Sequence, residues 1–275
     1  MANPNRDEKQ KRAAHEALEL LNPTICRIFE RYLNRYFKKN FHRLRVTRDG
    51  EAPAIEPDHG LVVYCNHASW WDPLIMYYLS RTLYSDRKGF GPIDAVALEK
   101  YKFMRKIGLF PVEQDSSRGS VHFLNVSHGL LKEPMTSLWL TPQGEFADAR
   151  VRPVTFKPGL AHLARDCGKA TFVPMALEYC FWNESKPELL VRFGVPINSA
   201  EPKDKAIDDW QAQLQMALQT AQDKLAMDAI SRDPERFREV LQGSVGVGVA
   251  YDGWRRIKAW ARGRRFSAAH EDEKS

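Results

Sequence analysis

Apolar and polar residues follow two different periods along the middle of the chain. Short apolar or alternating runs predict strands over residues 41–47, 60–65, 94–98, 109–112, 136–140, 170–178 and 189–195. Between them, apolar residues at three-and-four spacing predict helices over residues 69–80, 100–107, 120–131 and 158–166. Strands that alternate with helices predict an α/β fold, in which helices flank a central, mostly parallel sheet. Active-site loops of such folds lie at the carboxyl ends of the strands.

Helical patterns also occupy the two ends of the chain. The spacing predicts a helix over residues 25–41, a long helix over 203–227 and a further helix that starts at Asp233-Pro234. We therefore expect four regions. They are an N-terminal amphipathic helical region (1–40), a central α/β domain (41–200), a helical region (201–242) and a glycine-rich hinge with a basic amphipathic tail (243–275).

The predicted N-terminal helix combines an apolar face rich in Phe and Tyr with a basic face. Arg27, Arg31, Arg35 and Lys39 recur every four residues, and Lys38 lies beside them. This composition is typical of a helix that lies in a membrane interface. The alternative is a helix that packs on the core and leaves its basic face in water.

The C-terminal tail has a similar composition. Trp254 and Ile257 share a helical face, Trp260 lies close to it, and six basic residues surround them. Residues 1–50 contain 12 Lys and Arg against 6 Asp and Glu, and residues 251–275 contain 7 against 4. Anionic lipid attracts such residues by roughly 1 kcal/mol for each Lys or Arg near its surface, so we expect an anionic membrane surface as a partner. Nucleic acid is the competing interpretation, but no helix-turn-helix, RNP or zinc-finger pattern accompanies the basic segments, and we expect no nucleic-acid partner.

Composition excludes several classes of protein. The chain has 275 residues, 43% hydrophobic and 28% charged, which is a globular balance. Its apolar runs fall far short of the ~18 residues that span a bilayer, and its first residues are polar, so we expect neither a transmembrane helix nor a secretory signal. The four cysteines lie far apart and the histidines lack metal-ligand spacing, so we expect reduced thiols and no metal.

Candidate catalytic residues follow the apolar run at 60–65. His67 and Asp72 lie just beyond this predicted strand, and on one continuous helix they would point about 140° apart. Because Asp72 precedes Pro73, we expect a turn that folds Asp72 back toward His67. An imidazole oriented by a carboxylate can accept the proton of a substrate hydroxyl. Alternatively, Asp72 only caps its helix and His67 is an ordinary strand-end residue.

These residues belong to the first of four blocks that together resemble a known family. The segment Asn66-His67-x-x-x-x-Asp72 resembles the first motif of the glycerolipid acyltransferases, the PlsC-like superfamily of lysophosphatidate and lysophospholipid acyltransferases. Three further segments resemble its later motifs in the same order: Gly-Leu-Phe-Pro-Val-Glu at 108–113, Leu-Thr-Pro-Gln-Gly-Glu at 140–145 and Phe-Val-Pro-Met-Ala at 172–176. The resemblance covers about residues 41–197, so it implies that the central region is an acyltransferase domain.

The resemblance implies transfer of a fatty acyl group to the hydroxyl of a lysophospholipid, with acyl-CoA or acyl-carrier protein as co-substrate and no other cofactor. His67 would be the general base and Asp72 would fix its tautomer. Asn66 would orient the loop, and backbone N–H groups around Gly144 would stabilise the oxyanion. No acyl-enzyme is implied, which agrees with the absence of a G-x-S-x-G motif.

The second and third blocks depart from the family's pattern. Gln143 stands where the family has Glu, Glu145 and Phe146 stand where it has Thr and Arg, and the second block ends in Glu113 instead of Arg. The family's phosphate-binding arginine is therefore absent from its usual place. The residues that we assign to substrate binding are Asn66, Gln143, Gly144, Glu145, Arg118, Arg150 and Arg152. The three arginines are the nearest candidate donors to a phosphate, although each is equally compatible with an ordinary solvated arginine.

Together these features predict a monotopic, peripheral acyltransferase on the cytoplasmic face of the cell membrane. The acceptor implied by the family is 1-acylglycerol-3-phosphate. The altered blocks leave two alternatives, which are an enzyme for a glycolipid, another lysolipid or another membrane alcohol, and a catalytically silent lipid-binding protein.

Overall fold

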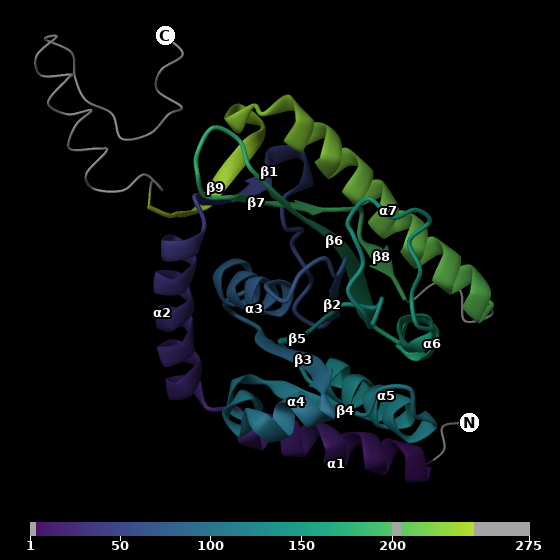
Figure 1. Cartoon of the computed structure of the whole chain (residues 1–275). Helices are drawn as coiled ribbons and strands as arrows, with labels where there is room; N and C mark the ends of the chain where they lie inside the picture. The colour runs from purple at the N-terminus through teal and green to yellow at the C-terminus, as the bar shows by residue number, and fades with distance from the viewer. Residues whose placement is uncertain (1–3, 200–204, 245–275) are drawn as a thin grey trace, which may run out of the picture.

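One nine-stranded sheet organises the computed structural model, which describes residues 4–199 and 205–244 (Figure 1). The strands follow the order β4-β3-β5-β2-β6-β7-β1-β9, and β8 pairs with β6. They are β1 (Arg43–Thr47), β2 (Gly60–Cys65), β3 (Lys88–Asp94), β4 (Leu109–Val112), β5 (Thr136–Leu140), β6 (Ala170–Cys180), β7 (Glu188–Phe193), β8 (Ile197–Asn198) and β9 (Phe237–Gln242). Pairing is parallel from β4 to β6 and between β7 and β1, so the predicted α/β fold with a mostly parallel sheet is confirmed.

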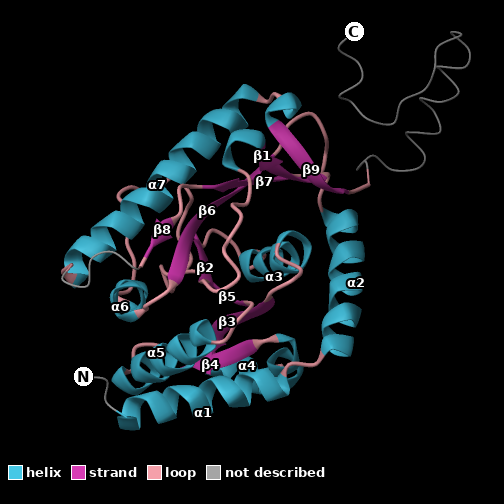
Figure 2. Cartoon of the chain, turned by 180° about the vertical axis from the view of Figure 1, so that it is seen from behind, coloured by secondary structure: helices cyan, strands magenta, loops and turns pink. Residues whose placement is uncertain are grey.

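Helices cover both faces of this sheet (Figures 1 and 2). The α-helices are α1 (Pro4–Leu20), α2 (Pro23–Asn40), α3 (Asp72–Leu83), α4 (Ala95–Lys100), α5 (Ser117–Lys132), α6 (Gly159–Asp166) and α7 (Ile207–Ser231). One apolar cluster joins the sheet to α5, α6 and α7, with α1 packed along α5, and a second joins the opposite face to α3 and α2. Because the sheet is buried on both faces, its central strands are continuous apolar runs.

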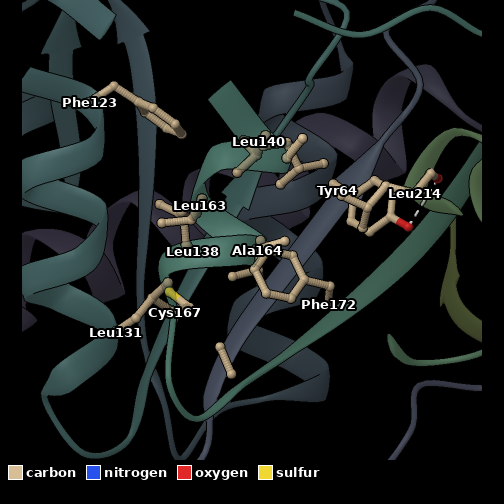
Figure 3. Packing of buried hydrophobic residues seen from close by; sticks show 14 of the residues in the cluster. Tyr64, Phe123, Leu131, Leu138, Leu140, Leu163, Ala164, Cys167, Phe172 and Leu214 are labelled. Atoms are coloured by element: carbon tan, nitrogen blue, oxygen red, sulfur yellow. Dashed lines mark hydrogen bonds between the residues drawn. The ribbon is translucent and has the colours of Figure 1, made fainter. Parts of the chain in front are cut away.

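The central strand β2 illustrates this division of the core. All six of its residues are buried. Val62 and Tyr64 point into the cluster beneath α5, α6 and α7, whereas Leu61, Val63 and Cys65 point into the cluster beneath α3 and α2. In Figure 3 the Tyr64 hydroxyl donates a hydrogen bond to the carbonyl oxygen of Leu214, at 3.2 Å.

Three of the predicted elements are wrong. The sequence predicts a strand at 94–98, but the strand in this region, β3, ends at Asp94 and the residues after it form α4. The Asp94 side chain accepts the Ala97 N–H at 3.0 Å and thereby caps α4. The helix expected at 100–107 is a 3-10 helix, Lys102–Ile107, which Gly108 terminates with φ of 98°. The helix expected after Asp233 lasts one 3-10 turn (Pro234–Arg236), after which the chain forms β9 against β1.

The N-terminal region contains two helices, because Asn22 starts α2 as a separate element. The Asn22 Oδ1 atom accepts the N–H groups of Thr24 and Ile25. Leu33 and Phe37 on α2 are fully buried, as in a helix packed on the core, whereas Ile28 and Tyr32 are 60% and 54% exposed. The apolar face of α2 is therefore shared between the core and the surface.

The remaining predicted regions are only partly described. Residues 200–204 precede α7, and residues 245–275, which include most of the predicted hinge and basic tail, also lie outside the described residues. Gly243 and Ser244 donate their N–H groups to the carbonyl oxygens of His42 and Lys38. Among the helices that the structure describes, none has the length and apolar character needed to cross a bilayer.

Candidate active site

The site begins where β2 leaves the sheet. Asn66 is buried, and its side chain continues the pairing between β2 and β6. Its Oδ1 atom accepts the Leu177 N–H at 2.8 Å, and its Nδ2 atom donates to the Leu177 carbonyl oxygen at 3.0 Å. The structure therefore places Asn66 where it holds the start of the loop, with its amide directed at the backbone of β6.

The loop then folds Asp72 back onto His67, as expected from the turn before Pro73. His67 Nδ1 lies 2.9 Å from Asp72 Oδ2, and the same oxygen accepts the Ser69 N–H at 2.8 Å. The Asp72 side chain is fully buried, whereas that of His67 is 15% exposed. Since the Asp72 carboxylate can only accept a hydrogen bond, the neutral imidazole carries its proton on Nδ1 and donates it to Oδ2. Nε2 then has an available lone pair, and it has no hydrogen-bond partner among the described residues.

The third block forms a second loop that packs directly on His67. Gln143 Oε1 accepts the His67 backbone N–H at 2.7 Å, and the Ala147 N–H donates to the His67 carbonyl oxygen at 2.8 Å. The Phe146 ring, which is 63% exposed, lies 4.5 Å from the imidazole between centroids. The fold thus brings the first and third blocks together, and Phe146 contacts the imidazole of His67, which the sequence did not predict.

The backbone of this second loop is shaped by Gly144. Gly144 has φ of 74°, and its N–H donates to the Thr141 carbonyl oxygen at 3.2 Å. The next two N–H groups, those of Glu145 and Phe146, donate no hydrogen bond to any described residue. Of the amides around Gly144, the two that follow it are therefore available to a ligand, and the Glu145 side chain is exposed.

The three candidate arginines are not gathered into one cationic site. Arg150 is bidentate to Asp148, at 2.8 and 2.7 Å, and is 89% exposed. Arg152 is held by Asp223 of α7 at 2.9 and 2.7 Å, whereas Arg118 is exposed in the first turn of α5. Burial raises the pKa of Glu178 at the end of β6, and the charges of Arg150 and Arg152 oppose that shift.

A further cation beside the loop was not predicted. The stem of Lys157 crosses Gly144, because a Cβ atom built on this glycine would lie 2.7 Å from Lys157 Cε. The Lys157 amine pairs with Asp115 at 2.8 Å and its side chain is 48% exposed. Lys157 lies outside all four sequence blocks, so the motifs did not predict a lysine at the site.

Tyr179 also went unnoticed in the sequence. Its hydroxyl donates a hydrogen bond to Asp72 Oδ1, on the side of the carboxylate away from His67. Burial, together with the charge of Asp72, raises the pKa of this hydroxyl far above its ordinary range. The alternation of Met175, Leu177 and Tyr179 on one face of β6 was the available signal, since that face also carries the start of α3.

The remaining titratable side chain near the dyad is a buried thiol. Burial, and secondarily the charge of Asp72, raises the pKa of Cys65 well above its ordinary range, and its Sγ atom contacts Met76 Sδ at 3.0 Å. Such a thiol is a poor nucleophile. Within residues 4–199 and 205–244, no group of three His, Cys, Asp or Glu side chains has an arrangement that would hold a metal ion.

Comparison with known families gives one match. A family model described as Acyltransferase matches residues 43–178. The matched segment starts with β1 and extends into β6, so it contains the loop that carries His67 and Asp72 and the loop that packs on His67. None of the curated proteins in the comparison matches the chain.

Proposed function

Because the chain belongs to the acyltransferase family, we propose that it transfers a fatty acyl group from an acyl thioester to the hydroxyl of a membrane lipid, with His67 as general base. The observation that carries this proposal is the hydrogen bond from His67 Nδ1 to the buried carboxylate of Asp72. It leaves Nε2 as a proton acceptor at the partly exposed edge of the site.

The reaction proceeds by direct attack. His67 Nε2 takes the proton of the acceptor hydroxyl as the oxygen bonds to the thioester carbonyl carbon. The resulting oxyanion accepts hydrogen bonds from the free amides of Glu145 and Phe146. Collapse breaks the carbon–sulfur bond, and the leaving thiolate of acyl-CoA or acyl-carrier protein receives the proton from His67. Asp72 stays ionised and stabilises the transient imidazolium, while Asn66 and Gln143 hold the two loops.

The acceptor implied by the family is 1-acylglycerol-3-phosphate. Of the three candidate arginines, Arg118 on α5 is the one that no carboxylate partners among the described residues, so we assign it to the phosphate. Lys157 lies beside Gly144, and its amine would exchange Asp115 for the phosphate. A different membrane alcohol is the second candidate. It is favoured by Phe146, whose exposed ring lies on the imidazole where the family has its arginine.

We further propose that α2 places the enzyme on the anionic cytoplasmic leaflet. A row of rings runs from the 3-10 helix after α4, along α2, to the catalytic loop. This aromatic belt consists of Phe103, Phe29, Tyr32, Tyr36, Trp71 and Trp70. Successive centroids lie 5.9, 6.1, 5.5, 5.1 and 4.4 Å apart. Exposed arginines of α2 accompany the belt, which is the composition of an interfacial helix.

Acyl transfer from radiolabelled acyl-CoA and acyl-carrier protein tests the proposal directly. The acceptor panel contains lysophosphatidate, other lysophospholipids, a glycolipid and an uncharged lipid alcohol. We expect product from the wild type and a loss of at least about a thousandfold in His67→Ala. The matched control is His122→Ala, because His122 is exposed on α5 and contacts neither loop of the site.

The outcomes separate the alternatives. Product with phosphate-bearing acceptors only would favour lysophosphatidate, and product with uncharged acceptors only would favour the second candidate. Equal activity in wild type and His67→Ala would refute the general-base role. No product with any acceptor, from folded protein that binds liposomes, would favour a catalytically silent lipid-binding protein. Salt-sensitive binding of DNA or RNA without binding to liposomes would contradict the membrane proposal.

A further inference from the structure

Tyr179 occupies the far side of the carboxylate that orients His67. We propose that Tyr179 is a positioning residue, whose hydroxyl fixes the plane and the charge distribution of Asp72 and thereby sets the proton affinity of the His67–Asp72 pair. This inference rests on the proposed function for its effect on catalysis. Its effect on the pair is independent of any substrate.

The sheet explains how a residue 107 positions from Asp72 reaches it. Pairing between β2 and β6 ends with Cys65 opposite Met175. Strand β6 continues beyond this point, and the Asn66 side chain pairs with the backbone of Leu177. Two residues further on, Tyr179 points to the same face as Leu177. That face carries the start of α3, so the hydroxyl reaches Asp72 Oδ1, the carboxylate oxygen that does not contact His67.

The Tyr179 hydroxyl is one of the few groups that stabilise the buried charge of Asp72. The fully buried carboxylate accepts three hydrogen bonds, from His67 Nδ1 and the Ser69 N–H at Oδ2 and from Tyr179 at Oδ1. Among the described residues, no Lys or Arg side chain pairs with Asp72, and its contact with His67 is a hydrogen bond. Tyr179 is therefore the sole described donor to Oδ1, and an ionised buried carboxylate depends on such donors.

Packing keeps the Tyr179 ring in register with Asp72. Its centroid lies 6.3 Å from that of Phe41, which in turn contacts Trp71 in the catalytic loop. The raised pKa of the hydroxyl keeps it protonated, and hence a donor, at neutral pH. The titratable groups that face Asp72 are His67 from its own loop, Cys65 from the end of β2 and Tyr179 from β6.

Removal of the hydroxyl has a defined electrostatic consequence. The hydrogen bond from the Tyr179 O–H stabilises the negative charge of the Asp72 carboxylate. The carboxylate therefore attracts a proton, on itself or on His67, less strongly. In Tyr179→Phe the buried Oδ1 atom of Asp72 has lost this donor, and the negative charge of the carboxylate is less stabilised. The proton affinity of the His67–Asp72 pair therefore rises. A larger fraction of His67 is then protonated at neutral pH and cannot act as a base.

The experiment compares Tyr179→Phe with Tyr64→Phe. Tyr64 is also buried, and its hydroxyl donates to a backbone carbonyl on α7, away from the site (Figure 3). For Tyr179→Phe we expect kcat to fall about tenfold at neutral pH with KM unchanged. We also expect the acidic limb of the pH profile of kcat/KM to move to higher pH. Tyr64→Phe should change neither, although each variant loses one buried hydroxyl.

A second set of measurements needs no activity. In protein labelled at the histidine ring carbons, the pH midpoint of the His67 signal should rise in Tyr179→Phe and not in Tyr64→Phe. In wild type labelled at tyrosine Cζ, the Tyr179 signal should change at the same pH midpoint, whereas that of Tyr64 should not. This last measurement holds even if Tyr179→Phe does not fold.

The results distinguish failure of this inference from failure of the proposed function. If His67→Ala is inactive but Tyr179→Phe and Tyr64→Phe share one kcat and one pH profile, Tyr179 is only a packing residue. The absence of any change in the wild-type Tyr179 signal across the titration of His67 overturns the inference in the same way. If His67→Ala keeps full activity while the histidine and tyrosine signals titrate together, the proposed function fails and the positioning contact stands.

Discussion

At the scale of single residues, the candidate site depends on backbone geometry as much as on the side chains of His67 and Asp72. Gln143 and Phe146 reach His67 only because the chain between them turns sharply at Gly144. Its φ of 74° lies in the left-handed region, which residues with a Cβ atom rarely adopt. The amides of Glu145 and Phe146, which follow this turn, donate no hydrogen bond to any described residue.

This geometry makes Gly144→Ala a specific test of the loop. We expect the substitution to lower the free energy of unfolding by roughly 1–2 kcal/mol, because alanine is strained at positive φ. The new Cβ atom also displaces the stem of Lys157, which lies 2.7 Å away at Cε. We also expect kcat to fall by more than about tenfold, since the displaced loop carries the proposed oxyanion donors. Urea unfolding and steady-state kinetics measure the two effects.

Gly168→Ala is the matched control for this prediction. A Cβ atom on Gly168 would meet no atom within 4 Å, and its φ is not positive. The control should therefore keep both stability and kcat. If Gly144→Ala keeps wild-type kcat while losing stability, the loop geometry does not contribute to catalysis.

The sequence predicts the local part of the site and not the distant part. His67 and Asp72 lie five residues apart, and the sequence predicts that a turn brings them together, although α3 begins at Asp72 itself and not at Pro73. Lys157 and Tyr179 belong to other elements, and their positions depend on how the sheet and its loops assemble. No short-range rule contains that information, because strand order and register are tertiary properties.

At the scale of elements, the packing of α1 on α5 couples stability to pH. The two helices approach closely at Gly129, where a Cβ atom would lie 2.2 Å from the Gln10 carbonyl oxygen. His128 is buried beside this contact, and its Nδ1 atom lies 3.6 Å from Cys167 Sγ. Burial lowers the pKa of His128 to about 4, with Arg6 and Lys132 lowering it further and Asp166 opposing the shift.

The sign of this shift determines how stability changes with pH. Since the folded state binds a proton on His128 less readily than the unfolded state, the stabilisation is complete above the unfolded value of 6.5 and declines toward pH 4. We expect the free energy of unfolding to fall by roughly 2 kcal/mol more in the wild type than in His128→Gln between pH 7.5 and 5. Urea unfolding at a series of pH values measures this difference.

The chosen window separates His128 from the carboxylates. Asp49 and Asp166 also have lowered pKa values in the folded state, but they lose their stabilisation at lower pH. His122→Gln, on the exposed face of the same helix, should follow the wild type. Parallel curves for wild type and His128→Gln would contradict the assignment.

The pattern of hydrophobic residues predicts elements well where it is unambiguous. The apolar run of β2 and the segments of α5 and α7 fall close to their predicted positions. The errors occur where a short segment is compatible with two structures. Residues after Asp233 begin with a helical capping signal, yet Phe237 and Leu241 are buried by pairing of β9 with β1. Tertiary pairing outweighs the local signal there.

At the scale of the whole molecule, the two faces of the sheet have different tasks. The face under α5, α6 and α7 is sealed by an apolar cluster that includes α1 (Figure 2). The opposite face carries α3 with Asp72 at its start, and α2 lies outside α3 with part of its apolar side exposed. The aromatic belt connects that exposed side to Trp70 and Trp71, two of the four residues between His67 and Asp72.

Membrane attachment through α2 is therefore the prediction that belongs to this scale. Arg27, Arg31 and Arg35 are exposed along the helix. If each contributes about 1 kcal/mol to the attraction of anionic lipid, Gln at all three positions should weaken binding to phosphatidylserine-containing vesicles by roughly a hundredfold. Cosedimentation at several salt concentrations measures this, and the salt dependence should decrease in the variant.

The control for this prediction lies on the neighbouring helix. Lys9, Lys11 and Arg12 of α1 are also exposed, so their replacement by Gln removes the same charge from the same end of the chain. If net charge alone attracts the protein, the two triple variants should bind equally weakly. If α2 itself lies on the lipid, only its variant should lose binding. Its acyl transfer to lipids in vesicles should then fall with the bound fraction, because the base and its aromatic belt no longer meet the acceptor at the surface.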